Sequence, residues 1–210
     1  MSRIQRHWHW SVPYIETLAL QQHRRQRMLQ GEAELLLLAE HPPTITLGKR
    51  GGQILNTPLN TTVQQIRRGG LATWHGPGQL ALYPIIHLHK RRLGIRNFVC
   101  ALERSIIDVL ALYQITAKRS SSPGIWVGEK KIASIGLDVK DGISIHGAAL
   151  NIYNEPRVFE CIEPCGDPTL QYTNLLLESN QQPPSLHSIG LEWVDLFLKR
   201  INNKEVDTIV

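Results

Sequence analysis

Residues 131–152 read KIASIGLDVKDGISIHGAALNI, and this pattern predicts two antiparallel β-strands. The apolar runs at 131–139 and 143–152 are separated by Asp141 and Gly142, which favour a two-residue hairpin turn because both residue types tolerate positive φ. Antiparallel strands joined by tight turns need no crossover helix. This region therefore argues against a doubly wound parallel sheet.

The rest of the chain alternates between helical and strand patterns. Helices are expected where apolar residues recur at helical spacing, and strands where short apolar or alternating runs end at turn residues. The predicted elements are helices at 13–30, 97–113 and 186–201, and strands at 34–40, 44–47, 80–86 and 125–127. The order helix, strands, helix, strands, helix predicts a mixed α+β or α/β fold.

The composition indicates a single domain spanning residues 1–210. Of the 210 residues, 42% are hydrophobic and 20% are charged, which suits a compact core and excludes a disordered or fibrous protein. No apolar run approaches the roughly 20 residues of a membrane-spanning helix. The net charge of +5 favours an acidic partner, which nucleic acid, an acidic protein or a phosphorylated ligand would each satisfy.

The cysteines indicate a reducing compartment. Cys100, Cys161 and Cys165 are an odd number without zinc-type spacing, so neither a disulfide framework nor a structural metal site is expected. The first residues lack the apolar segment of an export signal. We therefore expect a cytoplasmic protein without a bound metal ion.

A glycine-rich segment at 67–80 reads RRGGLATWHGPGQL and is predicted to be a binding loop. Its glycines allow the backbone to approach a ligand, and Arg68, Thr73, His75 and Gln79 supply hydrogen-bond donors around it. The segment matches neither glycine-rich phosphate motif, so no nucleotide site follows from it. The alternative is a loop that only turns a corner in the chain.

Two residues are candidates for catalysis. Cys165 lies between Pro164 and Gly166, which predicts an exposed turn, and an accessible thiol near a cation is the reactive kind. Lys131 stands at the mouth of an apolar strand, where partial desolvation suits an amine to proton transfer. The simpler interpretation of Lys131 is a surface lysine like the neighbouring Lys130.

The other cysteines and one histidine have plainer interpretations. Cys100 lies in an apolar run that predicts a buried, inert thiol, and Cys161 is intermediate between Cys100 and Cys165. His146 precedes small residues on a strand. It is expected either to line the floor of a pocket or to be a hydrogen-bonded core histidine.

Seven segments together resemble the lipoyl(octanoyl) transferases, which are octanoyl-acyl carrier protein:protein N-octanoyltransferases of the biotin/lipoate protein ligase fold. The segments occur in family order and cover most of residues 34–175. They are EHPPTITLG (40–48), RGG (68–70), TWHGPGQ (73–79), PGIWV (123–127), KIASIG (131–136), HG with ALN (146–151) and PCG (164–166). The resemblance implies a central mixed β-sheet flanked by helices, with the catalytic core at about 34–175.

The resemblance implies acyl transfer without ATP or another cofactor. Octanoate is expected to pass from an acyl carrier protein to Cys165, as an acyl-enzyme, and then to a lysine of a lipoyl domain. Lys131 matches the family's catalytic lysine, which activates the thiol and takes protons from the thiol and from the incoming amine. The implied substrate-binding residues are Arg68, Gly69, Gly70, Leu71, Ala72, Thr73, Trp74, His75, Ser134, Ile135, Gly136, His146, Gly147 and Ala148.

Two positions depart from the family pattern. Trp74 stands where the family most often has Tyr, and Ala148 stands where Leu is usual. Both changes stay apolar and leave Cys165 and Lys131 untouched. We expect the acyl pocket to differ at its rim and in its depth.

The implied partners are octanoyl-acyl carrier protein and the lipoyl domains of 2-oxoacid dehydrogenases and glycine cleavage proteins. These partners are typically acidic, so the arginines within 24–27, or the basic run at 90–92, are candidate docking faces unless they are only solvated surface. No nucleic acid or membrane is expected as a partner. The chain is expected to be a monomer.

Three alternatives remain open at this point. An ATP-dependent lipoate protein ligase of the same fold needs no nucleophilic cysteine, so the Cys165 turn argues against it. A non-enzymatic basic binding module is a second alternative, although the aromatic and basic residues do not interleave as in a nucleic-acid motif. A catalytically inactive homologue that only relays acyl groups is the third.

Overall fold

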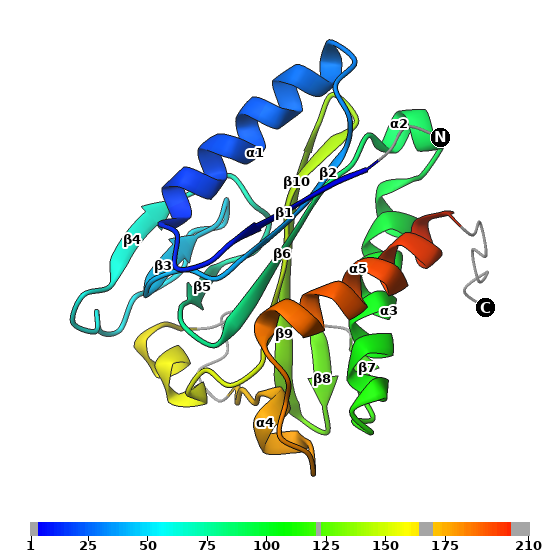
Figure 1. The fold of residues 1–210 in the computed structure, drawn as a ribbon. Coiled ribbons are helices and arrows are strands. Elements are labelled where there is room, and N and C mark those ends of the chain that lie inside the picture. The colour runs from blue at the N-terminus through cyan, green and yellow to red at the C-terminus, as the bar shows by residue number, and fades with distance from the viewer. Residues whose placement is uncertain (1–3, 121–122, 164–169, 203–210) are drawn as a thin grey trace.

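The computed structural model describes residues 4–120, 123–163 and 170–202, which form two β-sheets with helices on both faces of the larger one (Figure 1). The strands are β1 (Gln5–His9), β2 (Leu35–Ala39), β3 (Thr44–Leu47), β4 (Thr62–Gln65), β5 (Ala72–His75), β6 (Gln79–Ile85), β7 (Lys118–Arg119), β8 (Ile125–Val127), β9 (Lys130–Lys140) and β10 (Ile143–Asn151). The helices are α1 (Tyr14–Leu29), α2 (Leu88–Arg91), α3 (Ile95–Leu112), α4 (Leu175–Glu178) and α5 (Leu186–Asn202), with the 3-10 helix η1 (Pro156–Cys161).

Both sheets contain parallel and antiparallel pairs. Among the described residues, the larger sheet has the strand order β1-β2-β6-β10-β9-β8-β7 and the smaller sheet has the order β4-β3-β5. β1 pairs with β2 and β3 with β4 in parallel, and the remaining neighbours are antiparallel. The prediction of a mixed α/β fold with a central mixed sheet flanked by helices is confirmed.

The predicted hairpin is present between β9 and β10. Its turn residues Asp141 and Gly142 have φ angles of 54° and 72°. Two successive residues with positive φ are the signature of the turn that matches the twist of paired strands. Local turn chemistry therefore sets the register of the two strands that carry Lys131 and His146.

Helices cover both faces of the larger sheet, so its central strands are apolar throughout. In β2, Leu35 and Leu37 pack in the cluster under α1, whereas Leu36 and Leu38 pack in the cluster under α3 and α5 (Figure 1). Side chains alternate between the faces of a strand. Burial of both faces explains the uninterrupted LLLLA run.

The smaller sheet contains a strand that was expected to be part of a binding loop. Residues 72–75 form β5, which pairs with β3 and buries all four of its side chains. Ala72 and Trp74 pack in the apolar cluster of this sheet, so Thr73 and His75 lie on the opposite face of the strand. This alternation is a strand pattern that the flanking glycines obscured.

The three predicted helices agree with the structure except at their ends. The helix expected at 97–113 begins at Ile95 and ends at Leu112. The strands β1, β4, β5 and β7 and the short helices α2, α4 and η1 were not predicted from the sequence. Across the described ranges, no helix is long and apolar enough to cross a membrane.

Candidate active site

Lys131 is a buried lysine at the start of β9. It is 2% exposed, whereas Lys130 is exposed, because successive strand residues point to opposite faces. Its Nζ lies 5.4 Å from the ring centroid of Trp126, its neighbour across the β8–β9 pair. Its backbone is clamped on both sides, since its N–H donates to Gln171 O at 2.9 Å and its carbonyl accepts from Thr173 N–H at 3.0 Å.

Gly124 leaves the space that the Lys131 side chain fills. A Cβ at Gly124 would lie 2.6 Å from Ala133 O and 3.2 Å from Lys131 Nζ, and ordinary contacts begin near 3.4 Å. Its φ of +130° is also one that residues with side chains rarely adopt. The PGIWV segment therefore packs directly on the candidate catalytic lysine.

Arg68 organises the first part of the glycine-rich segment. It is buried, and its Nη2 donates to Thr46 O at 2.7 Å while its Nη1 donates to Gly69 O at 2.9 Å. The Gly69 N–H in turn donates to Leu137 O on β9 at 2.9 Å. A Cβ at Gly136 would lie 3.0 Å from Arg68 Cδ, so glycine permits this close approach.

The structure brings the three predicted substrate-binding segments together. The β9–β10 pairing places residues 134–136 opposite residues 147–149, with His146 opposite Leu137. Because Gly69 donates to that same Leu137, the glycine-rich segment meets both strands at this point. The predicted binding residues thus belong to one region of the fold.

His75 is a buried histidine between the two sheets. Burial, followed by the charges of His41 and Arg68, holds the pKa of His75 well below its usual value, so its ring is neutral. The ring stacks on Tyr14 with 5.2 Å between centroids. Its Nδ1 lies 2.8 Å from Gln79 Oε1. Arg68, His75 and Gln79 are therefore hydrogen-bonded inside the protein instead of extending into an open loop, whereas the buried Thr73 hydroxyl has no hydrogen-bond partner among the described residues.

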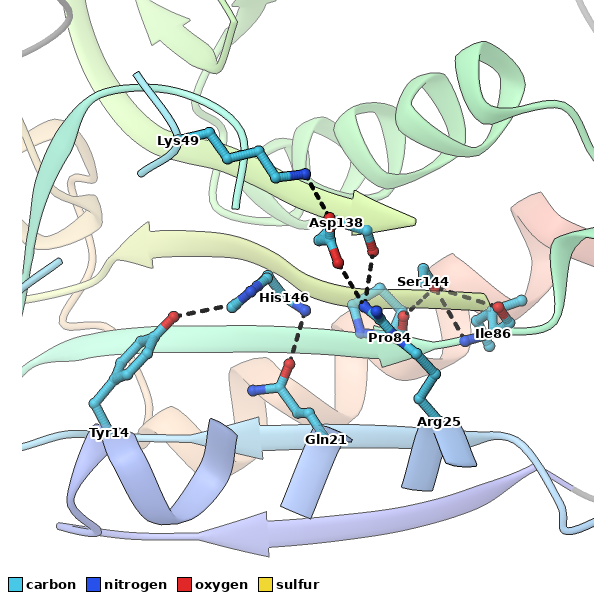
Figure 2. Close-up of polar contacts among 9 residues, drawn as sticks. All are labelled: Tyr14, Gln21, Arg25, Lys49, Pro84, Ile86, Asp138, Ser144 and His146. Carbon is cyan, nitrogen blue, oxygen red and sulfur yellow. Dashed lines mark hydrogen bonds and ion pairs between the residues drawn. The ribbon is translucent and has the colours of Figure 1, made fainter. Parts of the chain in front are cut away.

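His146 has a positive φ of 58° in β10. It lies two residues before Ala148, where the paired register of β10 with β6 ends opposite Leu82. Its own N–H is instead accepted by Gln21 Oε1 at 2.7 Å, and its Nδ1 lies 3.2 Å from Tyr14 OH (Figure 2). Burial, then the charge of Arg68, lowers the pKa of His146 to about 4. It is a neutral, hydrogen-bonded core histidine.

Asp138 joins α1 to the glycine-rich segment. It accepts from Lys49 Nζ at 2.6 Å and from Arg25 Nη2 at 2.9 Å (Figure 2). Burial raises the pKa of Asp138, but hydrogen bonds from Lys49 and Arg25 outweigh burial and hold that pKa below its usual value. The backbone N–H of Lys49 also donates to Arg68 O at 2.9 Å. Through Lys49, the Asp138 carboxylate therefore helps to hold the glycine-rich segment in place.

The arginines within 24–27, one of the two candidate docking faces, take part in ion pairs within the chain, and their role in docking stays a prediction. All three are ion-paired, with Glu32 or Asp138 as the acceptor. In the basic run at 90–92, Arg91 is likewise paired, with Glu34 at 2.6 Å. Each of these arginines lies on its helix beside an acidic side chain that is distant in the sequence or beyond the end of the helix.

Cys165 and the rest of the 164–166 turn lie outside the described residues, so the role of Cys165 stays a prediction. Cys161 is buried, and burial raises the pKa of its thiol, which disfavours the reactive thiolate. Cys100 is only half-buried, contrary to the expectation of a fully buried thiol, and its Sγ accepts from Arg119 Nη1 at 3.5 Å. It lies at the edge of the buried face of α3.

The described chain is anchored on both sides of residues 164–169. Before them, Glu163 N–H donates to Gln53 O at 2.9 Å. After them, Gln171 O accepts from Lys131 N–H at 2.9 Å. The second anchor is therefore the candidate catalytic lysine itself.

Sequence reasoning missed the roles of Tyr14, His41 and Tyr83, which form a buried ring cluster against His75. His41 Nδ1 donates to Val12 O at 2.8 Å, so its Nε2 accepts from Tyr83 OH, also at 2.8 Å. Burial lowers the pKa of His41 to about 4. The available signal was weak, since these are polar rings on faces that otherwise read as apolar.

Comparison with known proteins defines the class of this site. The family model for the lipoyl protein ligase A/B catalytic domain matches residues 13–175. The fold resembles a lipoate-protein ligase A bound with ATP, with a TM-score of 0.71 and 14% identity over 99% of this chain and 90% of that one. It also resembles biotin protein ligase from Aquifex aeolicus, with a TM-score of 0.59 and 11% identity over 99% and 73%. The chain belongs to the lipoyl protein ligase A/B catalytic domain family.

Sequence relatives narrow the class to an acyltransferase. An octanoyltransferase of Chromohalobacter salexigens is 39% identical over 176 residues, which are 82% of this chain and 80% of the relative. A mitochondrial octanoyltransferase of Arabidopsis thaliana is 36% identical over 206 residues, or 93% and 88%. The resemblance drawn from the motifs is confirmed, and the chain is an enzyme of the octanoyltransferase type.

Proposed function

We propose that this enzyme performs octanoyl transfer in protein lipoylation with the octanoyl group held on Cys165 as a thioester. In the first step the Cys165 thiolate attacks the acyl carrier thioester, the bond to the carrier sulfur breaks, and the carrier leaves as a thiol. In the second step a lysine amine of a lipoyl domain attacks the enzyme thioester, an amide bond forms and the Cys165 thiol returns. The thioester of the octanoyl donor supplies the free energy for both transfers, so ATP has no role.

Lys131 is proposed to move the protons of both steps. Its amine takes the proton of the Cys165 thiol and gives it to the departing carrier sulfur. It then takes a proton from the attacking lysine and returns it to the Cys165 sulfur. The observation that supports this role is that Lys131 is buried, with 2% exposure, and that its backbone is hydrogen-bonded to Gln171 and Thr173. These two residues follow closely after the segment that contains Cys165.

The acyl chain is proposed to lie where the three substrate-binding segments meet. Residues 68–75, 134–136 and 146–148 are in mutual contact through the bond from Gly69 to Leu137 and the β9–β10 pairing. Backbone N–H groups at such a junction can stabilise the oxyanion of each tetrahedral intermediate. We infer that acyl carrier protein is the donor and lipoyl domains are the acceptors, in the cytoplasm, and that the net charge of +5 favours both acidic partners.

Paired variants test this proposal in a transfer assay without ATP, with octanoyl-acyl carrier protein as donor and a lipoyl domain as acceptor. Cys165→Ser and Lys131→Met are expected to lower kcat by at least about 100-fold. The matched controls Cys161→Ser and Lys130→Met are expected to keep most of the rate, because Cys161 is a buried thiol and Lys130 faces solvent.

The opposite results would redirect the assignment. A Cys165→Ser enzyme with the rate of the wild type would contradict the thioester mechanism. Transfer that appears only with free octanoate and ATP would instead support the ligase alternative of the same fold.

A further inference from the structure

Asn151, at the end of β10, links the backbone clamp of Lys131 to the protein interior. Its Nδ2 donates to Thr173 O at 3.0 Å, and the Thr173 N–H donates to Lys131 O at 3.0 Å. On its other side, Asn151 Oδ1 accepts from Gln79 Nε2 at 2.9 Å. Asn151 and Gln79 are 2% and 3% exposed, so water does not compete for these bonds.

One carbonyl determines the direction of every donor in this chain of bonds. Thr173 O can only accept, so the nitrogen of Asn151 faces Thr173 and its oxygen faces Gln79. The nitrogen of Gln79 must then face Asn151, which leaves Gln79 Oε1 to accept from His75 Nδ1 at 2.8 Å. His75 therefore carries its proton on Nδ1 and presents Nε2 as an acceptor.

The same chain continues to the substrate-binding loop. Arg68 Nη2 and Nε donate to Thr46 Oγ1 at 2.9 and 3.3 Å, which leaves the Thr46 hydroxyl proton for His75 Nε2 at 3.3 Å. The donor and the acceptor of each hydrogen bond in this chain are thus determined. An unbroken chain of hydrogen bonds runs from Arg68 to the backbone of Lys131.

We infer that Asn151, supported by Gln79, is a positioning residue that holds Lys131 in register with the substrate-binding loop. It acts through Thr173 and does not contact the acyl group. The inference rests on the proposed function in that Lys131 serves the reaction. The expected consequence of losing the bond to Thr173 is a displaced amine at Lys131 and a slower chemical step, with the acyl-binding segments left in place.

Two substitutions at Asn151 separate positioning from packing. Asn151→Leu keeps the branching and the number of side-chain heavy atoms, with a larger volume that the control below shares, and makes neither hydrogen bond. Asn151→Asp keeps an acceptor for Gln79 but sets an oxygen against Thr173 O, a repulsion that protonation relieves because a carboxylic acid can donate. The Asn151→Asp enzyme is therefore expected to recover rate relative to wild type as the pH falls, which a purely structural defect would not produce.

Asn174→Leu is the matched control. Asn174 is 3% exposed and is bonded in the same way, with Nδ2 donating to Asn154 O at 2.9 Å and Oδ1 accepting from Leu177 N–H at 2.8 Å. It caps α4 and lies outside the chain of bonds to Lys131. Its loss is expected to lower the melting temperature as much as Asn151→Leu does, with kcat kept within about threefold of wild type.

Steady-state octanoyl transfer measures the effect. Asn151→Leu is expected to lower kcat by about 10- to 100-fold, as for a misplacement of about 1 Å, with KM for the octanoyl donor within about twofold of wild type. The inference is overturned if kcat of Asn151→Leu matches that of Asn174→Leu, or if the loss appears in KM alone. The fate of the thioester mechanism is measured separately by Cys165→Ser, so failure of one is distinguishable from failure of the other.

Discussion

Replacing Gly124 by alanine is expected to displace Lys131 and slow octanoyl transfer. The new methyl group would lie 2.6 Å from Ala133 O, 3.2 Å from Lys131 Nζ and closer still to Lys131 Cε. The carbonyl belongs to the rigid β8–β9 pair, whereas the lysine side chain has rotatable bonds. The strain is therefore relieved by movement of Lys131, and the site is altered without a change in any proposed catalytic residue.

The size of the effect follows from the distances. The contact with Lys131 Cε is shorter than the 2.6 Å contact with Ala133 O, so Lys131 must move by more than about 0.8 Å to reach the 3.4 Å at which ordinary contacts begin. A reacting group misplaced by about 1 Å loses about 100-fold in rate, so we expect kcat of Gly124→Ala to fall by about that factor. The φ of +130° strains the backbone of the alanine variant and lowers its free energy of unfolding by about 1–3 kcal/mol.

Gly31→Ala is the control that separates collision from backbone strain. Gly31 has a φ of +98° and no atom within 4 Å of an added Cβ. Both variants are compared with wild type by kcat for octanoyl transfer and by urea unfolding. Gly31→Ala should lose stability and keep its rate. The reasoning is refuted if Gly124→Ala transfers octanoate at the wild-type rate, or if Gly31→Ala is slowed equally.

Two further predictions concern pH-dependent stability, both measured by urea unfolding. Asp138→Asn should lower the free energy of unfolding by about 2 kcal/mol at pH 7. Because the pKa of Asp138 is depressed, this stabilisation is present above the ordinary carboxyl pKa of about 4 and is lost progressively as the pH falls below it, so the difference between the two proteins should shrink with falling pH. A difference that stays constant as the pH falls below about 4 would exclude the ion pairs as its cause. The pKa of His146 is lowered to about 4 in the folded protein. As the pH falls below about 6.5, the unfolded chain therefore binds a proton that the native chain lacks. Between pH 6.5 and 4, the free energy of unfolding of the wild type should fall by up to about 1.4 kcal/mol per pH unit more than that of His146→Asn. Asparagine tolerates the positive φ at this position, and parallel pH profiles for the two proteins would contradict the assignment of His146 as a buried neutral group.

Features with a local cause could be predicted from the sequence. The turn at Asp141 and Gly142 was predictable because positive φ is a property of the residues themselves. The apolar stripe of α3 was likewise visible, since its period matches the helix. Alternation along a strand also requires that one of Lys130 and Lys131 face outward. Which of the two is buried depends on the pairing of β9 with Trp126 and with residues 171–173, and no local pattern encodes it.

Features that join distant segments could not be predicted. The bonds from Asp138 reach Lys49 and Arg25 over 89 and 113 positions, and each partner alone reads as a surface charge. β5 was hidden because glycines on either side favoured a loop. The positive φ of His146 accompanies a bond from its N–H to Gln21, 125 positions away, so it has no signal in the residues around His146.

The central claim is that octanoate rests on Cys165 between donor and acceptor. The most direct test is the intact mass of the enzyme after incubation with octanoyl-acyl carrier protein, without ATP, under conditions that preserve thioesters, beside Cys165→Ser and Cys161→Ser. The account predicts one octanoyl adduct on wild type and on Cys161→Ser, none on Cys165→Ser, and its discharge when a lipoyl domain is added. An adduct that persists in Cys165→Ser, or transfer to the lipoyl domain by that variant at the wild-type rate, would contradict the account.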